Sequence, residues 1–505
     1  MKTRQKLTYS FLLLTAIIVV ANLLSSGLFF RLDFTADSRY TLSSATKSIL
    51  ENIDEPVTIT AYFSVDLPPH IAKNRQDFKE MLEEYSAVSG GNIVYEFKNP
   101  NENPEIEQEA MQKGIQPFLI NVREKDQVKQ QKAYMGAQIS YGDKEEALPF
   151  IPLGGAMEYS LSSSIKKVIL QERKSVALLQ GHGEPGINAF QQVMQELQVV
   201  YDVEPVTLTD TANNLNQYET VLIVAPTDSF PSWHLTQLDA FLKKGGNMLV
   251  AINRVGGDLS KAQGYEITTG LETWLEEKGI QVENNFMIDA SCGNVMVAQN
   301  TGMYRMQSQV MFPYMPVIKN FADHPITKGL ESVLLQFASP INYVGDTSVT
   351  VTALLKSSDN ADTQPPTTFF DVQKQWTKRD FNKNNLVGAA LFESKSTTNP
   401  MKMVVFGDGN FPVNGEGQSA MQQQADNIHL FVNAIDYLSD DTGLIGLRTK
   451  GVTSRPIDEL EDGTKAILKY LNFLLPLLLV IGYGVVRAQK RKIKRIKRMQ
   501  KGFID

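Results

Sequence analysis

Cysteine is nearly absent from this sequence of 505 residues, in which Cys292 is the single one. An internal disulfide and a thiolate metal cluster are therefore both excluded. A lone thiol can act as a nucleophile, but a small buried side chain is the simpler interpretation of Cys292. The sequence also has no Cys-x-x-Cys pattern and no Gly-Lys-Ser/Thr phosphate-binding pattern. Redox chemistry and ATP hydrolysis by this chain are therefore not expected.

The overall composition is that of a globular protein. Hydrophobic residues make up 42% and charged residues 21% of the chain, which excludes broad disorder and a many-helix membrane protein. The length exceeds what one hydrophobic core supports, and about two to four domains are expected.

Charge is distributed unevenly along the chain. The net charge is -7 overall, but the segment 487–505 contributes +8 and the first six residues contribute +3, which leaves -18 for the body between them. An acidic body does not indicate a nucleic-acid-binding protein. The cations of the basic segment are Arg487, Lys490, Arg491, Lys492, Lys494, Arg495, Lys497, Arg498 and Lys501.

Two apolar segments are predicted to cross a membrane. Residues 7–30 contain no charged side chain and exceed the roughly 20 residues that a bilayer core requires. We expect an uncleaved anchor here rather than a signal peptide, whose apolar region is shorter. Residues 467–486 form the second segment, in which Lys469 lies near the end and can reach the headgroups.

The flanking cations predict the orientation. Lysine and arginine beside membrane segments stay in the cytoplasm. Residues 1–6 and the basic tail 487–505 are therefore expected inside, and the body outside. In a Gram-negative bacterium this means a two-pass protein of the inner membrane with a periplasmic body. The tail is explained by topology alone, although contact with anionic lipid or with a cytoplasmic partner are alternatives.

The first half of the body alternates strands and helices. Ser43 is a plausible N-cap for a helix that extends to Leu50, and residues 57–63 are typical of a strand. A helix over 71–86, a strand over 93–97, a helix over 105–113 and three further strands complete the order β-α-β-α-β-β-β. This order resembles a thioredoxin-like layer.

The second half predicts a parallel sheet with helices on both faces. Strands are expected over 174–180, 203–208, 220–225, 247–252 and 403–407, and helices over 188–198, 235–244, 269–278 and 427–438. Residues 293–311 give no clear pattern, and residues 357–366 are typical of an exposed loop.

Three side chains are candidates for binding a ligand because they follow strands of this sheet. Ligands usually bind at the carboxyl ends of such strands. His182 and Glu184 lie in the loop after the first strand, and Asp408 follows the last one. A structural turn at Gly181–Glu184 is the simpler interpretation, a ligand site is the alternative, and catalysis by acid and base ranks below both.

An ordered set of motifs is similar to a known family. Gly181-His182-Gly183-Glu184 opens the second half, and the other motifs are Leu32-Asp33-Phe34-Thr35, Tyr40-Thr41-Leu42-Ser43, Pro56–Ile59, Leu67-Pro68-Pro69, Gln237–Phe241, Gly245-Gly246-Asn247, Phe312-Pro313-Tyr314, His324–Thr327 and Gly407–Phe411. Together with two anchors, this set resembles the auxiliary component of bacterial ABC transport systems of the gliding-motility type (GldG-like).

The resemblance implies a glutamine-amidotransferase-like (flavodoxin-like) core in the second half and a substrate-binding or partner-binding role beside a separate permease and ATPase. An amidotransferase requires a cysteine nucleophile on a tight turn after a strand. Pro226-Thr227-Asp228 follows the strand at 220–225, with no cysteine. We therefore expect no enzyme activity, catalytic residue, metal or cofactor.

The expected domains are a thioredoxin-like α/β domain over 31–172 and an amidotransferase-like α/β domain with insertions over 173–450, flanked by the two membrane segments. Two alternatives remain, a structural tether of an envelope or secretion machine and a membrane-anchored hydrolase that uses His182, Glu184 and Asp408. The transported substrate is not identified by the sequence.

Overall fold

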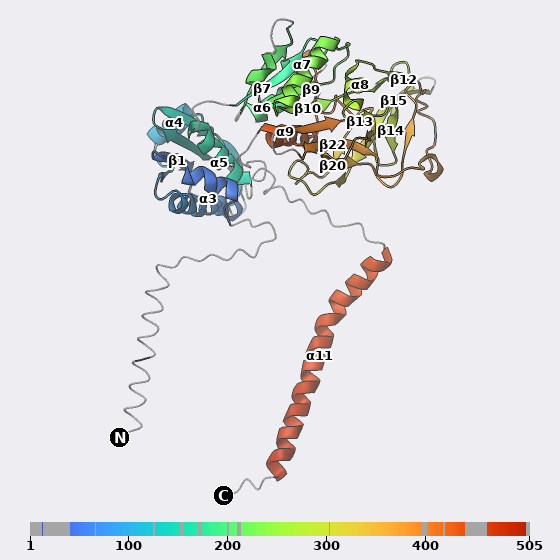
Figure 1. The fold of residues 1–505 in the computed structure, drawn as a ribbon. Helices are drawn as coiled ribbons and strands as arrows, with labels where there is room; N and C mark the ends of the chain where they lie inside the picture. Colours follow the sequence, from blue (N-terminus) through green and yellow to red (C-terminus); the bar gives the residue numbers. More distant parts are fainter. Residues whose placement is uncertain are drawn as a thin grey trace. The chain divides into compact units, whose positions relative to one another are not determined.

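The computed structural model describes residues 41–439 and 462–500 together with Leu13, apart from residues 66, 125–126, 152–155, 170–173, 199–200, 210–213, 302–303, 396–400 and 418–419. The predicted anchor at 7–30 lies outside the described residues except for Leu13. The chain divides into two compact units, Met1–Thr453 and Ser454–Asp505. The blue to orange segments in Figure 1 belong to the first unit, and the red helix belongs to the second.

The first described region contains a four-stranded sheet in the order β2-β1-β5-β6. Strand β1 pairs in parallel with β2 and antiparallel with β5, and β5 pairs antiparallel with β6. Its elements are α2 (Ser44–Glu51), β1 (Val57–Phe63), α3 (Pro69–Val88), β2 (Ile93–Lys98), α4 (Pro104–Gln112), β3 (Phe118–Glu124), β4 (Gln127–Ala133), β5 (Met135–Tyr141), β6 (Lys144–Leu148) and α5 (Ala156–Ile169).

Local sequence accounts for these elements. The Ser43 side chain accepts a hydrogen bond from the Thr46 amide at 3.0 Å, which confirms the predicted N-cap of α2. Phe78, Leu82 and Tyr85 recur at helical spacing in α3 and are buried against Ile59 of β1. Each predicted strand and helix of this region is found, but β4 and α5 were not predicted, so the order β-α-β-α-β-β-β is confirmed only in part. The thioredoxin-like name stays a prediction.

The second region is built on an eight-stranded sheet in the order β17-β20-β22-β23-β10-β9-β7-β8. Its strands are β7 (Lys174–Gln180), β8 (Tyr201–Thr207), β9 (Thr220–Val224), β10 (Asn247–Ala251), β17 (Asn320–Phe321), β20 (Val349–Lys356), β22 (Val387–Ser394) and β23 (Lys402–Phe406). Five neighbouring strands, from β23 to β8, are parallel. The remaining three are antiparallel. The expected parallel sheet is thus corrected to a mixed sheet.

Helices cover both faces of this sheet. Leu222 of β9 lies in a core with α6 (Gln191–Leu197) and α9 (Ala425–Ser439), and α6 follows a 3-10 turn, η1 (Ile187–Phe190). Ile223 of β9 lies in a second core with α7 (Ser232–Lys243) and α8 (Leu271–Glu276). Successive strand residues point to opposite faces, so the apolar run of β9 serves both cores. Figure 1 shows α6 and α7 beside the green strands.

The remaining strands of this region form separate small sheets in the orders β11-β12, β13-β19, β14-β21 and β15-β16-β18. They are β11 (Val255–Asp258), β12 (Gln263–Glu266), β13 (Ile280–Val282), β14 (Phe286–Asp289), β15 (Cys292–Thr301), β16 (Tyr304–Ile318), β18 (Val333–Leu334), β19 (Ile341–Tyr343) and β21 (Ala361–Gln364), with 3-10 turns η2 (Asn214–Gln217) and η3 (Lys378–Asp380). The unassigned stretch 293–311 is largely a long hairpin of β15 and β16. The predicted loop at 357–366 was wrong in part, because it contains β21, which pairs with β14 and buries Ala361.

The second unit contains one long helix, α11 (Asp462–Gln500), with Pro476 inside it. Among the described residues, Gly463–Ile496 is the one helix long and apolar enough to cross a membrane, and none of its most apolar window is buried. This helix indicates membrane association. The predicted segment 467–486 lies within it, and the basic tail that was predicted to follow is helical as far as Gln500. The domain bounds 31–172 and 173–450 stay predictions.

Candidate functional site

The candidate site lies at the carboxyl edge of the parallel strands, where four loops follow β7, β9, β10 and β23. These loops begin at Gly181, Ala225, Ile252 and Gly407. Parallel strands bring their carboxyl ends to one edge of a sheet, which is where α/β proteins usually bind ligands.

The loop after β7 is held in one conformation by its glycines and by the loop after β9. Gly183 has φ of +74°, and a Cβ atom there would collide with the Thr227 hydroxyl. The His182 carbonyl accepts hydrogen bonds from the amides of Thr227 at 3.0 Å and Asp228 at 2.8 Å. Glycine at position 183 is therefore required by both backbone angle and close approach.

His182, Glu184 and His234 form a hydrogen-bonded chain. Glu184 accepts from the His182 amide at 2.6 Å, and its other oxygen lies 3.0 Å from His182 Nδ1. His182 Nε2 lies 2.6 Å from His234 Nδ1. His234 belongs to α7, so the chain connects the loop after β7 to the start of a helix on one face of the sheet.

One arrangement of protons satisfies both contacts with an ionised Glu184 and two neutral imidazoles. An ionised carboxylate is an acceptor only, so His182 Nδ1 donates to Glu184. With His182 neutral, its Nε2 accepts from His234 Nδ1, and His234 Nε2 becomes a lone-pair acceptor. Among the described residues His234 Nε2 has no hydrogen-bond partner, although it is buried.

Aromatic rings enclose the two imidazoles. Phe230 stacks on His182 with ring centroids 3.7 Å apart, and the Trp233 ring lies 3.6 Å from that of His234. His182 is 1% exposed and His234 is 8% exposed. Burial lowers the pKa of His234, and the neighbouring His182 lowers it further, against an opposing effect of Glu184. The surroundings of His234 therefore favour its neutral form.

Asp408 lies in a different part of the same edge. Strands β10 and β9 separate β23 from β7, which places the two loops about 14 Å apart at the usual strand spacing. The buried Asp408 carboxylate accepts hydrogen bonds from the amides of Gln336 at 2.6 Å and Asn410 at 2.7 Å. Burial raises the pKa of Asp408 to about 7, although backbone hydrogen bonds act in the opposite direction.

The structure thus brings together two of the three predicted side chains. His182 and Glu184 are in contact, and Asp408 holds the loop after β23 to residue 336. The contacts of Asp408 are those of a side chain that fixes two loops to each other.

The turn after β9 has an unusual backbone. Ala225 has φ of +47°, a conformation that residues other than glycine rarely adopt. A Cβ atom on Gly409 would lie 2.8 Å from Cα and Cβ of Ala225. Ala225 therefore occupies a tight turn, and the backbone of Gly409 packs against it. Cys292 lies at the start of β15, and burial raises the pKa of its thiol.

Sequence reasoning missed His234 and Phe230. Both follow β9 in the segment Phe230-Pro231-Ser232-Trp233-His234, where three aromatic rings precede and begin a helix at the ligand-binding edge. That clustering was the available signal. Among the described residues no group of three or more His, Cys, Asp or Glu side chains could hold a metal ion.

Comparison with known proteins places this region in a family. The family described as "ABC-type uncharacterized transport system" matches residues 173–437, and a domain of unknown function matches residues 36–140. An uncharacterized protein of Borreliella burgdorferi is 24% identical over 316 residues, which are 60% of this chain. The chain spans 62% of the length of that relative.

Two solved structures resemble parts of the fold. The mmIFT52 N-terminal domain is 14% identical with a TM-score of 0.37, covering 53% of this chain and 98% of that one. PurLQS from Thermotoga maritima is 12% identical with a TM-score of 0.26, covering 53% of this chain and 100% of that one. Because one family covers residues 173–437, more than half of the chain, the chain belongs to the auxiliary proteins of an ABC-type uncharacterized transport system.

Proposed function

We propose that this protein is a non-catalytic, membrane-anchored auxiliary subunit of a bacterial ABC transport system of the gliding-motility type, working with a separate permease and ATPase. The observation that carries the proposal is the family match over residues 173–437 in a chain that also has a helix long enough to cross a membrane. The sequence has no phosphate-binding loop of its own, so the ATP would be hydrolysed by another chain.

The proposed topology is two-pass, with both termini in the cytoplasm and the body in the periplasm. Its support is the order of residues along α11, where an apolar stretch is followed by a run of cations. The acidic body and the cations before the first apolar segment agree with this orientation.

The absence of catalysis is part of the proposal. Its support is that the side chains that could act are enclosed or engaged, since the Glu184 side chain is 0% exposed and Asp408 is fully buried. The segment Pro226-Thr227-Asp228 after β9 has no cysteine where an amidotransferase-like nucleophile would be expected.

The chain Glu184–His182–His234 is proposed as the place where the body responds to a ligand or partner. Its support is the unpartnered, buried His234 Nε2 at the edge of the sheet where ligands bind. A hydroxyl or amide donor on the ligand would satisfy this nitrogen.

Joint expression with the permease and ATPase of the same transport system tests the proposal. We expect the three proteins to co-purify in mild detergent, with ATP hydrolysis in the purified complex. A chain that purifies alone and stable while permease and ATPase remain together without it contradicts the proposal.

A structural tether of an envelope or secretion machine is the second candidate. The enclosure of the His182 and Glu184 side chains favours this candidate, because a tether needs no open ligand site. A thermal-shift screen of the full chain against sugars, lipids and peptides separates the two, since a tether shows no shift with any solute.

A hydrolase that uses His182, Glu184 and Asp408 is the remaining alternative. Replacing all three by alanine would then abolish function without lowering expression. Unchanged transport in a folded triple variant excludes it.

A further inference from the structure

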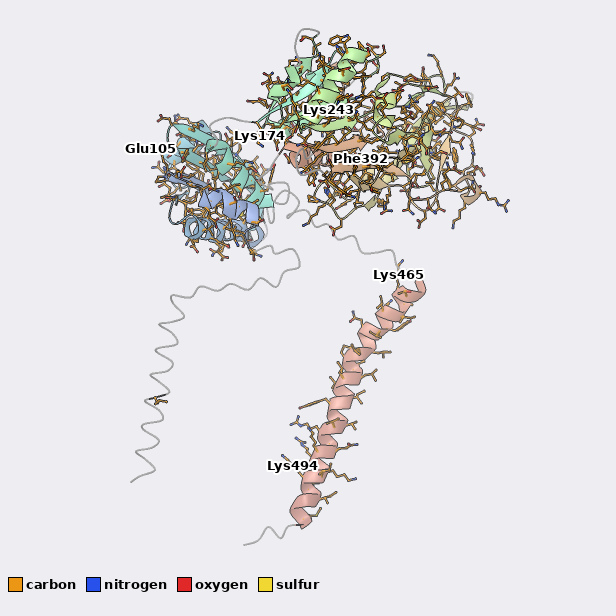
Figure 2. All side chains as sticks on the ribbon, in the orientation of Figure 1. Glu105, Lys174, Lys243, Phe392, Lys465 and Lys494 are labelled. Carbon is orange, nitrogen blue, oxygen red and sulfur yellow. The ribbon has the colours of Figure 1, made fainter. Side chains whose placement is uncertain are left out.

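We propose that the basic end of α11, Arg487–Gln500, is a docking helix for an acidic cytoplasmic protein with an apolar groove, namely the ATP-hydrolysing partner. The proposal rests on the proposed function, because it requires α11 to cross the membrane with this end inside. Figure 2 labels Lys465 and Lys494 near the two ends of the helix.

The length of α11 places this segment beyond the bilayer. At the α-helical rise, residues 467–486 span about 30 Å, the thickness of a hydrocarbon core. The helix then continues without a break from Arg487 to Gln500, a further distance of about 21 Å. The headgroup layer accounts for only about 5–8 Å of it, so the helix beyond Arg491 projects into water.

Two different faces run along this projecting segment. Arg487, Lys490, Arg491, Lys494 and Arg495 follow the three- and four-residue spacing of one helix face. Ile493, Ile496 and Met499 follow a three-residue spacing on the opposite face, which they share with Lys492, and all three apolar side chains are exposed. A helix that serves only as a topology signal needs its cations and has no need of this apolar stripe.

The stripe fits a protein groove better than a lipid surface. An amphipathic helix covers its apolar face with lipid by lying in the plane of the membrane. α11 instead runs continuously from its membrane segment into its basic end, so Ile496 and Met499 leave the headgroup layer. An apolar stripe flanked by cations is complementary to an apolar groove with an acidic rim.

Substitution of the stripe tests the docking in the complex of full chain, permease and ATPase. We expect the double variant Ile493→Ser/Ile496→Ser to retain about tenfold less ATPase than the wild type, since buried apolar anchors dominate such interfaces. Retention of the permease should not change, because the apolar part of α11 is intact. The matched control is Ala488→Ser/Gln489→Ser, which places two serines in the same segment and should retain the ATPase.

The outcomes separate this inference from the proposed function. A wild-type chain that retains neither partner contradicts the proposed function. A wild type that retains the ATPase while Ile493→Ser/Ile496→Ser retains it equally contradicts the docking helix alone. Equal loss in the serine control shows that helix content decides retention, and also contradicts the docking helix.

A fluorescence experiment decides between groove and lipid. An environment-sensitive dye is attached to Met499→Cys in the full chain with Cys292→Ser, in vesicles of phosphatidylcholine with and without phosphatidylglycerol. We expect water-like emission in both, and apolar emission from the same dye at Val480→Cys. A blue shift at position 499 that requires phosphatidylglycerol would overturn the proposal in favour of an anionic membrane surface.

Discussion

At the scale of single residues, the buried histidine pair is the feature that sequence reasoning half identified. His182 and Glu184 were predicted because they follow a strand, and their contact is a local one within a four-residue loop. His234 was not predicted because it is 52 residues away from His182 along the chain. Only the pairing of β7 with β9 brings the loop and the helix together.

Replacing His234 by alanine is expected to destabilise the second region. His182 Nε2 would lose its partner inside an apolar enclosure, and an unsatisfied buried polar group costs about 1–3 kcal/mol. Thermal unfolding of the full chain, followed by tryptophan fluorescence, measures the effect. His429→Ala is the control, because His429 is partly exposed and its acidic neighbours lie 3.6 Å and 3.8 Å away. Equal melting temperatures for the two variants would contradict this account of the pair.

Asp408 is expected to make stability depend on pH. Its folded-state pKa is raised to about 7, whereas an unfolded aspartate titrates at about 3.9. Between these values the folded state binds more protons, so the free energy of unfolding decreases as pH rises through this window. Asp408→Asn cannot titrate and should lack this contribution. Denaturant unfolding of both proteins at pH values of about 4, 5.5 and 7 measures how the free energy of unfolding changes with pH. The same pH dependence in both proteins would contradict a raised pKa of Asp408.

At the scale of elements, predictability followed the strength of the hydrophobic pattern. Strands β7, β9 and β10 were found because each is a continuous apolar run buried on both faces. The hairpin of β15 and β16 was not assigned, since its sequence mixes polar residues and methionines without a clean alternation. Strand β21 was mistaken for part of a loop because it precedes Pro365-Pro366 and is mostly polar. The antiparallel edge of the sheet has no local signal, because strand direction depends on the connections.

The turn after β7 is expected to be intolerant of a side chain at Gly183. Gly183→Ala forces a left-handed backbone on alanine and drives Cβ into the Thr227 hydroxyl. Gly417→Ala is the matched control, since Gly417 has φ of +61° and nothing lies within 4 Å of its Cβ position. We expect the control to lose about 1 kcal/mol from backbone strain, and Gly183→Ala to lose more.

A second substitution identifies the source of that difference. Adding Thr227→Ala to Gly183→Ala removes the hydroxyl that the new Cβ would meet, so part of the lost stability should return. Thermal unfolding of the single and double variants measures the recovery. An additive loss in the double variant would show that collision with Thr227 is not the cause.

At the scale of the whole molecule, the orientation of the body relative to the membrane can be measured directly. In a full chain with Cys292→Ser, Met421→Cys puts a thiol on an exposed side chain of the body, and Met499→Cys puts one at the basic end of α11. Because cations hold their end of a membrane helix in the cytoplasm, a membrane-impermeant maleimide should label position 421 in intact spheroplasts. Position 499 should be labelled only after the membrane is permeabilised. Both sites are exposed, at 67% and 77%, so burial does not explain a difference between them. The reverse pattern would place the body in the cytoplasm and contradict both the proposed topology and the docking helix. Labelling of both sites in intact spheroplasts would mean that α11 does not cross the membrane.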